Sequence, residues 1–168
     1  MNDFVVADPK RCIGCRTCEV ACVLAHGGEN ALERLTADMF YPRLQVIKTA
    51  KVSMPVQCRQ CEDAPCARAC TVHAIRQSGS AVQVVAGKCV GCKACLLACP
   101  YGAIELIVTG AAGSKNEVKA SKCDLCVNQD SGPACVRVCP TKALQKVEGS
   151  LLAKRLRNKR LRAALGSE

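Results

Sequence analysis

The sequence predicts an α+β fold made of two nested halves, and three observations support this prediction. The chain has 168 residues, 16 of them cysteines, and the cysteines fall into four groups of four with none left over. Short apolar runs that resemble strands lie before and after these groups. Only two phenylalanines and two tyrosines are present to fill a conventional core. Much of the interior must therefore be built around whatever the cysteines bind.

The cysteines are expected to be metal ligands and not disulfide partners. Such a density occurs in secreted disulfide scaffolds and in intracellular metal-binding proteins. Residues 1–10 contain two acids, lack a basic start and have an apolar run only at 4–7, which argues against a secretory signal. No apolar run approaches about 18 residues, so no membrane span is expected. We therefore expect a reducing compartment, the cytoplasm, in which the thiols remain available.

The spacing within the groups predicts iron–sulfur clusters. Groups one and three read C-x2-C-x2-C-x3-C, and groups two and four lengthen only the middle gap. Three closely spaced thiols hold one [4Fe–4S] cubane, and the fourth reaches into a neighbouring cubane. Zinc more often takes two separate pairs of cysteines. The groups are Cys12, Cys15, Cys18, Cys22; Cys58, Cys61, Cys66, Cys70; Cys89, Cys92, Cys95, Cys99; and Cys123, Cys126, Cys135, Cys139.

The gaps between the groups predict which groups share clusters. Between Cys70 and Cys89 lie 18 residues, a gap typical of small two-cluster ferredoxins. Groups two and three should therefore form one ferredoxin-like half, and groups one and four the other. The predicted ligand sets are Cys12, Cys15, Cys18 and Cys139 (site I); Cys22, Cys123, Cys126 and Cys135 (site II); Cys58, Cys61, Cys66 and Cys99 (site III); and Cys70, Cys89, Cys92 and Cys95 (site IV).

These pairings divide the chain into three parts. The inner half spans 58–109. The outer half spans 1–57 and 110–149 and includes an insertion at 23–57, which we expect either to cover a cluster or to offer a docking surface. A basic arm spans 150–168.

Short elements are expected around the cysteine groups. Strands are predicted at 4–7, 44–48, 81–86, 104–108 and 144–147. Pro100 and Pro140 directly follow the last cysteine of groups three and four, where a proline helps to end a ligand-bearing helix, either as an ordinary stop or as a shield for the cluster. Val23 and Thr71 occupy the equivalent positions in groups one and two.

The formal net charge of +10 counts the cysteines as neutral. Each oxidised cluster with its four thiolates carries about −2, so four clusters would lower the charge to roughly +2. Nearby basic residues would favour reduction, although a solvated position is equally compatible with each of them: Lys10, Arg11, Arg16, Lys88, Lys93 and Lys122. His26 and His73 lie just beyond cysteines, but 16 thiols already satisfy four cubanes, so neither is expected to be a ligand.

The arm is predicted to be helical and carries six basic residues between 154 and 162. Its leucines are scattered around the helix, so no stripe for a membrane surface is present. Nucleic acid is disfavoured because no recognition motif accompanies the charges. The preferred interpretation is a subunit arm that lies against an acidic surface of a neighbour. A solvated tail is the alternative.

Several longer segments resemble a known family. FVVADPKRCIGCRTCEVAC, QCRQCEDAPCARAC, KCVGCKACLLACPYGAIE and KCDLCVNQDSGPACVRVCPTKAL are similar to the four-cluster electron-transfer subunits of the HydN/HycB type. Those subunits serve formate dehydrogenases, hydrogenases and related tungsten or molybdenum oxidoreductases. The resemblance runs through nearly the whole chain and implies four [4Fe–4S] clusters in a row and no catalysis by this subunit. Thr71 departs from the proline that is commoner in relatives.

The resemblance implies two redox partners. One is a tungsten- or molybdenum-pterin subunit that oxidises formate or an aldehyde, and the other is a hydrogenase or a flavoprotein. Some complexes of this kind stack into filaments, so we hypothesise that the arm joins further copies of the chain. The residues alone leave an alternative, a structural or assembly protein that holds iron–sulfur clusters or zinc. An independent enzyme is least favoured, because the cysteines are committed and no flavin or pterin signature is present.

Overall fold

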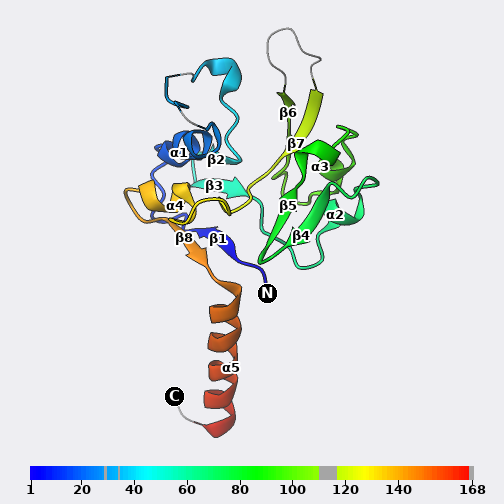
Figure 1. Cartoon of the computed structure of the whole chain (residues 1–168). Helices are drawn as coiled ribbons and strands as arrows, with labels where there is room; N and C mark the ends of the chain where they lie inside the picture. The colour runs from blue at the N-terminus through cyan, green and yellow to red at the C-terminus, as the bar shows by residue number, and fades with distance from the viewer. Residues whose placement is uncertain (29, 34, 110–116, 167–168) are drawn as a thin grey trace.

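The computed structural model describes residues 1–28, 30–33, 35–109 and 117–166 (Figure 1). The prediction of an α+β fold is confirmed, since short helices alternate with antiparallel two-stranded sheets. The first residues assigned to the second segment of the outer half, 110–116, and the last two of the arm, 167–168, lie outside the described residues.

The elements are short apart from two helices. In chain order they are β1 (Phe4–Ala7), α1 (Thr17–His26), β2 (Leu44–Lys48), β3 (Ser53–Gln57), α2 (Pro65–Arg68), β4 (Ile75–Ser78), β5 (Ala81–Val84), α3 (Ala94–Ala98), β6 (Glu105–Thr109), β7 (Glu117–Ser121), α4 (Ala134–Val138), β8 (Leu144–Val147) and α5 (Gly149–Leu165), with 3-10 turns at Ala37–Met39 and Ala86–Lys88.

Three of the predicted strands have the predicted bounds, namely β1, β2 and β8. The strand expected at 81–86 is shorter and ends at Val84, because a 3-10 turn begins at Ala86. The strand expected at 104–108 lies one residue later. Sequence reasoning missed β3, β4 and β7, each of which pairs with a strand that it did anticipate.

The sheets bring distant parts of the chain together. β1 pairs with β8, from Phe4 opposite Val147 to Ala7 opposite Leu144, whereas β2–β3, β4–β5 and β6–β7 are hairpins of consecutive strands. Figure 1 shows β1, β8, α1 and α4 on one side of the molecule and β4, β5, α2 and α3 on the other. Helix α1 packs on α4, and α2 packs on α3. The helices of cysteine groups one and four therefore lie together, as do those of groups two and three.

Two apolar clusters of buried residues largely follow this division, although Ala81 of β5 belongs to the first. One gathers Val5, Leu44, Val46 and Leu144 around the cysteines of groups one and four. The other gathers aliphatic side chains, among them Val82, around the cysteines of groups two and three. Cysteines are members of both clusters, so the interior is built around thiols as the composition suggested.

The ends of the ligand-bearing helices agree with the expected role of proline in α3 and α4, but α2 ends without one. Helices α3 and α4 do end just before Cys99–Pro100 and Cys139–Pro140. Helix α2 also ends at Arg68, although Thr71 stands in place of proline. A shared turn explains this, because the amide three residues after Cys70, Cys99 and Cys139 donates to the carbonyl of that cysteine.

Helix α5 extends away from the rest of the molecule (Figure 1). Its residues beyond Gly149 are nearly all exposed. Its start is fixed to the body, because the Gly149 amide donates to Asp3 Oδ1 at 3.0 Å and Lys146 Nζ lies 3.2 Å from Asp3 Oδ2. Among the described residues, no helix combines the length and apolarity that a membrane crossing requires.

Candidate metal centres

The structure gathers the thiols of sites I, III and IV around three separate cavities. Each cavity is lined by all four cysteines of one predicted set and by few polar atoms. The empty space at the three cavities, including the part that opens to solvent, is about 330, 320 and 320 Å³. In every case the fourth thiol comes from the partner group, since Cys139, Cys99 and Cys70 join three cysteines that are distant in sequence.

The cysteines of site II also lie close to one another. Burial raises the pKa of the Cys135 thiol, and the nearby thiolates of Cys123, Cys22 and Cys126 raise it further. Burial likewise raises the pKa of Cys123 to about 12. Cys18 of site I also raises the pKa of Cys135, so these effects indicate that the thiols of site II lie near one another and beside site I.

Burial makes the thiolate form unfavourable unless a cation is present. Burial raises the pKa of Cys18 and of Cys66 to about 11, with lesser contributions from neighbouring charges. A thiol ligates a metal only as the thiolate. The binding free energy of a positively charged metal centre must therefore offset this deprotonation, which makes metal binding and folding interdependent.

Backbone amides donate hydrogen bonds to cysteine sulfurs in all four sites. The amides of Ala143 and Ala74 each lie 3.2 Å from a sulfur, those of Cys139 and Cys70 respectively. Further N–H···S contacts reach Cys22 from Arg43, Cys58 from Gln60 and Cys89 from Ala120, at 3.3, 3.4 and 3.4 Å. Amide donors stabilise the negative charge on metal-bound sulfur and help to set the potential of iron–sulfur clusters.

The C-x-G-C loops of groups one and three have the same local construction. Gly14 and Gly91 have φ of +69° and +68°. A Cβ on Gly14 would approach Ser53 Oγ to 2.5 Å, and a Cβ on Gly91 would approach Val118 O to 2.6 Å. Only glycine allows this backbone to curl closely around a cluster while lying against a hairpin.

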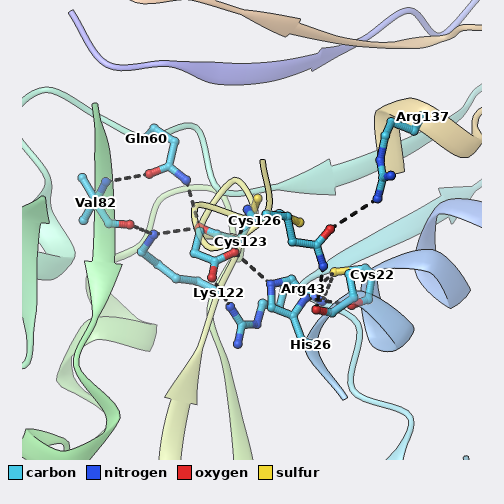
Figure 2. Close-up of polar contacts among 12 residues, drawn as sticks. Cys22, His26, Arg43, Gln60, Val82, Lys122, Cys123, Cys126 and Arg137 are labelled. Carbon is cyan, nitrogen blue, oxygen red and sulfur yellow. Dashed lines mark hydrogen bonds and ion pairs between the residues drawn. The ribbon is translucent and has the colours of Figure 1, made fainter. Parts of the chain in front are cut away.

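His26 and Arg43, labelled in Figure 2, both contact the carboxylate of Asp124 and form a charged network beside site II. His26 Nε2 lies 3.0 Å from Asp124 Oδ1, and Nδ1 lies 2.7 Å from the carbonyl oxygen of Cys22. Arg43 donates to Asp124 Oδ2 at 2.6 Å. Burial alone would lower the pKa of His26, but the hydrogen bond with Asp124 and those with Cys126 and Cys22 together outweigh burial and raise the pKa. Burial would raise the pKa of Asp124, but His26, Arg43 and the amide of Cys126 together outweigh burial and lower the pKa.

This network supports the expectation that neither histidine is a ligand. Ligand atoms of His26, Asp124 and Cys126 lie within 4.8 Å of one another, a grouping that could hold a single metal ion. Both ring nitrogens of His26 already face oxygen acceptors, however, which leaves no lone pair for a metal. His73 is exposed.

Lys122 differs in burial from the other basic residues near the cysteine groups. Lys10, Arg11, Arg16, Lys88 and Lys93 are exposed, which agrees with solvated positions. Lys122 is 3% exposed, and its Nζ lies 3.4 Å from Cys58 Sγ. Sequence reasoning could not distinguish this lysine, because its burial depends on tertiary packing.

The residues present fit four [4Fe–4S] clusters. Each set supplies four sulfurs and at least one amide donor, and three sets surround cavities of nearly equal size. All 16 cysteines are free thiols. These features define an iron–sulfur protein with an interior organised by thiolate ligands.

Comparison with known proteins agrees with this class. A family model described as a 4Fe-4S dicluster domain matches residues 49–148, more than half of the chain. The chain belongs to this family. The matched residues include cysteine groups two, three and four.

Relatives with known names extend the match to the whole chain. The electron transport protein HydN of Escherichia coli (strain K12) is 45% identical over 173 aligned residues, which cover 98% of this chain and 99% of HydN. The putative electron transport protein YsaA of the same strain is 48% identical over 145 residues, covering 86% of this chain and 89% of YsaA. Formate hydrogenlyase subunit 2 of the same strain is 40% identical over 187 residues, which cover 95% of this chain and 89% of that subunit. The resemblance inferred from the motifs is thereby confirmed.

Proposed function

We propose that this chain is a non-catalytic subunit that relays electrons through four [4Fe–4S] clusters bound at sites I to IV. When bound, such clusters each accept and release one electron. The observation that carries the proposal is the convergence of thiols from distant groups around three similar cavities and a fourth buried set. Four closely spaced clusters are useful when electrons travel farther than one tunnelling step. The names of the relatives, electron transport proteins and a formate hydrogenlyase subunit, support the same role.

The nested division into two ferredoxin-like halves is part of this proposal. The pairing of β1 with β8 and the packing of α1 on α4 support an outer half made of 1–57 and 110–149. The packing of α2 on α3 supports an inner half at 58–109. Gln60 Nε2 donates to the carbonyl oxygen of Cys123 at 2.9 Å, so site III of the inner half adjoins site II of the outer half. The order along the row is then I, II, III, IV.

The two ends of this row are suited to contact partners. Site I contains the exposed Cys15, and site IV contains the exposed Cys92. Each is flanked by an apolar side chain that faces solvent, Ile13 at 62% exposure and Val90 at 66%. Exposed apolar groups beside a redox centre favour docking of a partner and exclude water from the contact.

The partners we propose are redox subunits. One is a tungsten- or molybdenum-pterin subunit that oxidises formate or an aldehyde, and the other is a hydrogenase or flavoprotein in the cytoplasm. The name of formate hydrogenlyase subunit 2 supports a partner of this class. The exposed basic helix α5 supports an additional contact with an acidic surface, either on such a subunit or on a further copy of the chain.

Metal analysis tests the relay directly. A sample prepared without oxygen should contain about 16 iron atoms per chain, four for each cluster. Its visible absorbance should bleach with dithionite. Zinc in place of iron, or clusters that dithionite does not reduce, would favour the structural or assembly role over the relay.

Purification of the native complex tests the partners. A tungsten- or molybdenum-containing subunit should be recovered with the chain. A variant that ends after Glu148 lacks α5 and should form smaller particles in size-exclusion chromatography, because the arm is proposed to make an assembly contact. Unchanged particle size, with full iron content, would remove that role of the arm.

A further inference from the structure

The residue that precedes the first cysteine differs among the four groups. It is Arg11, Gln57, Lys88 and Lys122 in chain order. Arg11 and Lys88 are exposed, whereas Gln57 and Lys122 are buried. The two buried residues occupy equivalent places, each at the end of a hairpin. Gln57 donates to the carbonyl of Val5 in β1, and Lys122 donates to the carbonyl of Val82 in β5. One position thus holds a neutral side chain and the other a cation.

All three donors of the Lys122 ammonium have acceptors. Nζ lies 2.9 Å from the carbonyl oxygen of Cys123 and also donates to the carbonyl oxygen of Val82 (Figure 2). It lies 3.4 Å from Cys58 Sγ. An ammonium group carries three N–H bonds and a neutral amine only two. The arrangement therefore matches a positively charged lysine.

This charge lacks a carboxylate partner within the part of the chain that the structure describes. Lys122 takes part in none of the salt bridges found there. A buried ammonium without a negative neighbour is costly. The sulfur of Cys58 is the neighbour that can supply negative charge, as thiolate of site III.

Gln60 fixes the geometry around this contact (Figure 2). Its backbone amide lies 3.4 Å from Cys58 Sγ, and its side chain accepts from the Val82 amide at 2.8 Å and donates to the Cys123 carbonyl at 2.9 Å. The side chains of Gln60 and Lys122 therefore each contact the backbone of both Val82 and Cys123. The ammonium is held against site III by a rigid set of backbone partners and does not depend on a flexible surface position.

We propose that Lys122 is a positioning residue whose fixed positive charge raises the reduction potential of site III more than that of any other site. This inference rests on the proposed function, since it requires a redox-active cluster at that site. Reduction adds one electron, so the negative charge at site III rises by one while the charge of Lys122 stays constant and no proton moves. In a buried, weakly polarisable environment a cation at this distance stabilises the added charge strongly. The exposed lysines near other sites act through water and are screened.

A redox titration with dithionite, followed by electron paramagnetic resonance, tests this role in the complete, cluster-loaded protein. The main variant is Lys122→Gln, because the fold already accommodates glutamine at the equivalent position 57. The control is Lys88→Gln, which removes an exposed lysine from the same place before a cysteine group. Lys122→Arg retains the charge. Iron is measured in every sample.

Three results support the inference together. Lys122→Gln should retain about 16 iron atoms and shift one midpoint downward, by at least a tenfold change in the reduced-to-oxidised ratio at fixed potential, which corresponds to about 59 mV for one electron. The midpoint of site II, whose ligand Cys123 directly follows Lys122, should shift less, and those of sites I and IV should remain in place. Lys88→Gln should leave all four unchanged, and Lys122→Arg should stay near the wild-type value.

Contrary results are equally clear. Four unchanged midpoints in Lys122→Gln with full iron would overturn the inference while leaving the relay intact. If Lys122→Gln loses iron, restoration of iron by Lys122→Arg would support a requirement for the charge, and failure to restore it would show that lysine's shape, not its charge, matters. A wild-type protein without reducible clusters would instead contradict the proposed function itself.

Discussion

The chain follows two different paths after the last cysteine of a group. After Cys70, Cys99 and Cys139 the chain turns at once. The residue three positions after each of these cysteines has φ between 50° and 59°, and these residues are His73, Gly102 and Lys142. After Cys22 it remains helical as far as His26.

The turn is common to sequences with and without proline, so proline alone does not produce it. Amides that donate to the cysteine carbonyl occur in all three turns, and amides that donate to the cysteine sulfur occur after Cys70 and Cys139. The longer α1 has a different support, because the buried Glu19 accepts from the Val46 amide at 2.6 Å. That extra helical length brings His26 to Asp124 beside site II. Similar cysteine spacings can thus precede unlike structures when another segment supplies the contacts.

Removal of iron should have the largest effect, because it should abolish both the turns after the three later groups and the part of α1 that follows Cys22. An anaerobically chelated sample should lose cooperative thermal unfolding, since the thiol-lined cavities contribute little packing without the clusters. Circular dichroism measures this directly. A native-like cooperative transition in the iron-free chain would show that the apolar clusters suffice for folding.

Proline substitutions should distinguish the two paths. Val23→Pro interrupts α1 in its interior and should destabilise the holoprotein by about 3 kcal/mol or more. Thr71→Pro copies the residue present at positions 100 and 140 and should change stability by less than about 1 kcal/mol. Thermal loss of the visible absorbance compares the two variants. Equal destabilisation would mean that the turn after Cys70 differs from the other two in a way that excludes proline.

Asparagine substitutions should show what the extra length of α1 contributes. His26→Asn removes one partner of the half-buried Asp124 and should cost about 1–3 kcal/mol. His73→Asn is a matched control, because His73 is exposed and asparagine tolerates its φ of 50°. Denaturant unfolding of both holoproteins measures the difference. Comparable values for the two variants would remove a structural role for the His26–Asp124 contact.

The smallest effect should occur where α5, the other long helix, begins. Burial would raise the pKa of Asp3, but its bonds with Gly149 and Lys146 outweigh burial and leave the pKa lowered. The stabilisation is therefore complete above the unfolded pKa of about 3.9 and is lost as pH falls through the lower folded pKa. Asp3→Asn should cost less than about 1 kcal/mol at neutral pH. The deficit relative to wild type should shrink below about pH 4, and a deficit that grows there would contradict this assignment.

Cysteine spacing and local hydrophobic runs made much of this molecule predictable. The grouping of thiols and the bounds of β1, β2 and β8 follow from local pattern. The missed strands lack such a pattern, because β3 contains Pro55 and β4 and β7 are largely polar. The burial of Lys122 and the approach of His26 to Asp124 depend on segments 64 and 98 residues apart, respectively. No local signal could reveal those contacts.

The pairing of β1 with β8 has a consequence for synthesis on the ribosome. β4 and β5 are adjacent in sequence, so this hairpin can close soon after its residues emerge. β1 must wait until its partner, Leu144–Val147, has been translated. In the proposed ligand sets, the first three cysteines to be made are therefore among the last to meet their fourth ligand, Cys139, and we expect the chain to fold from the middle outward.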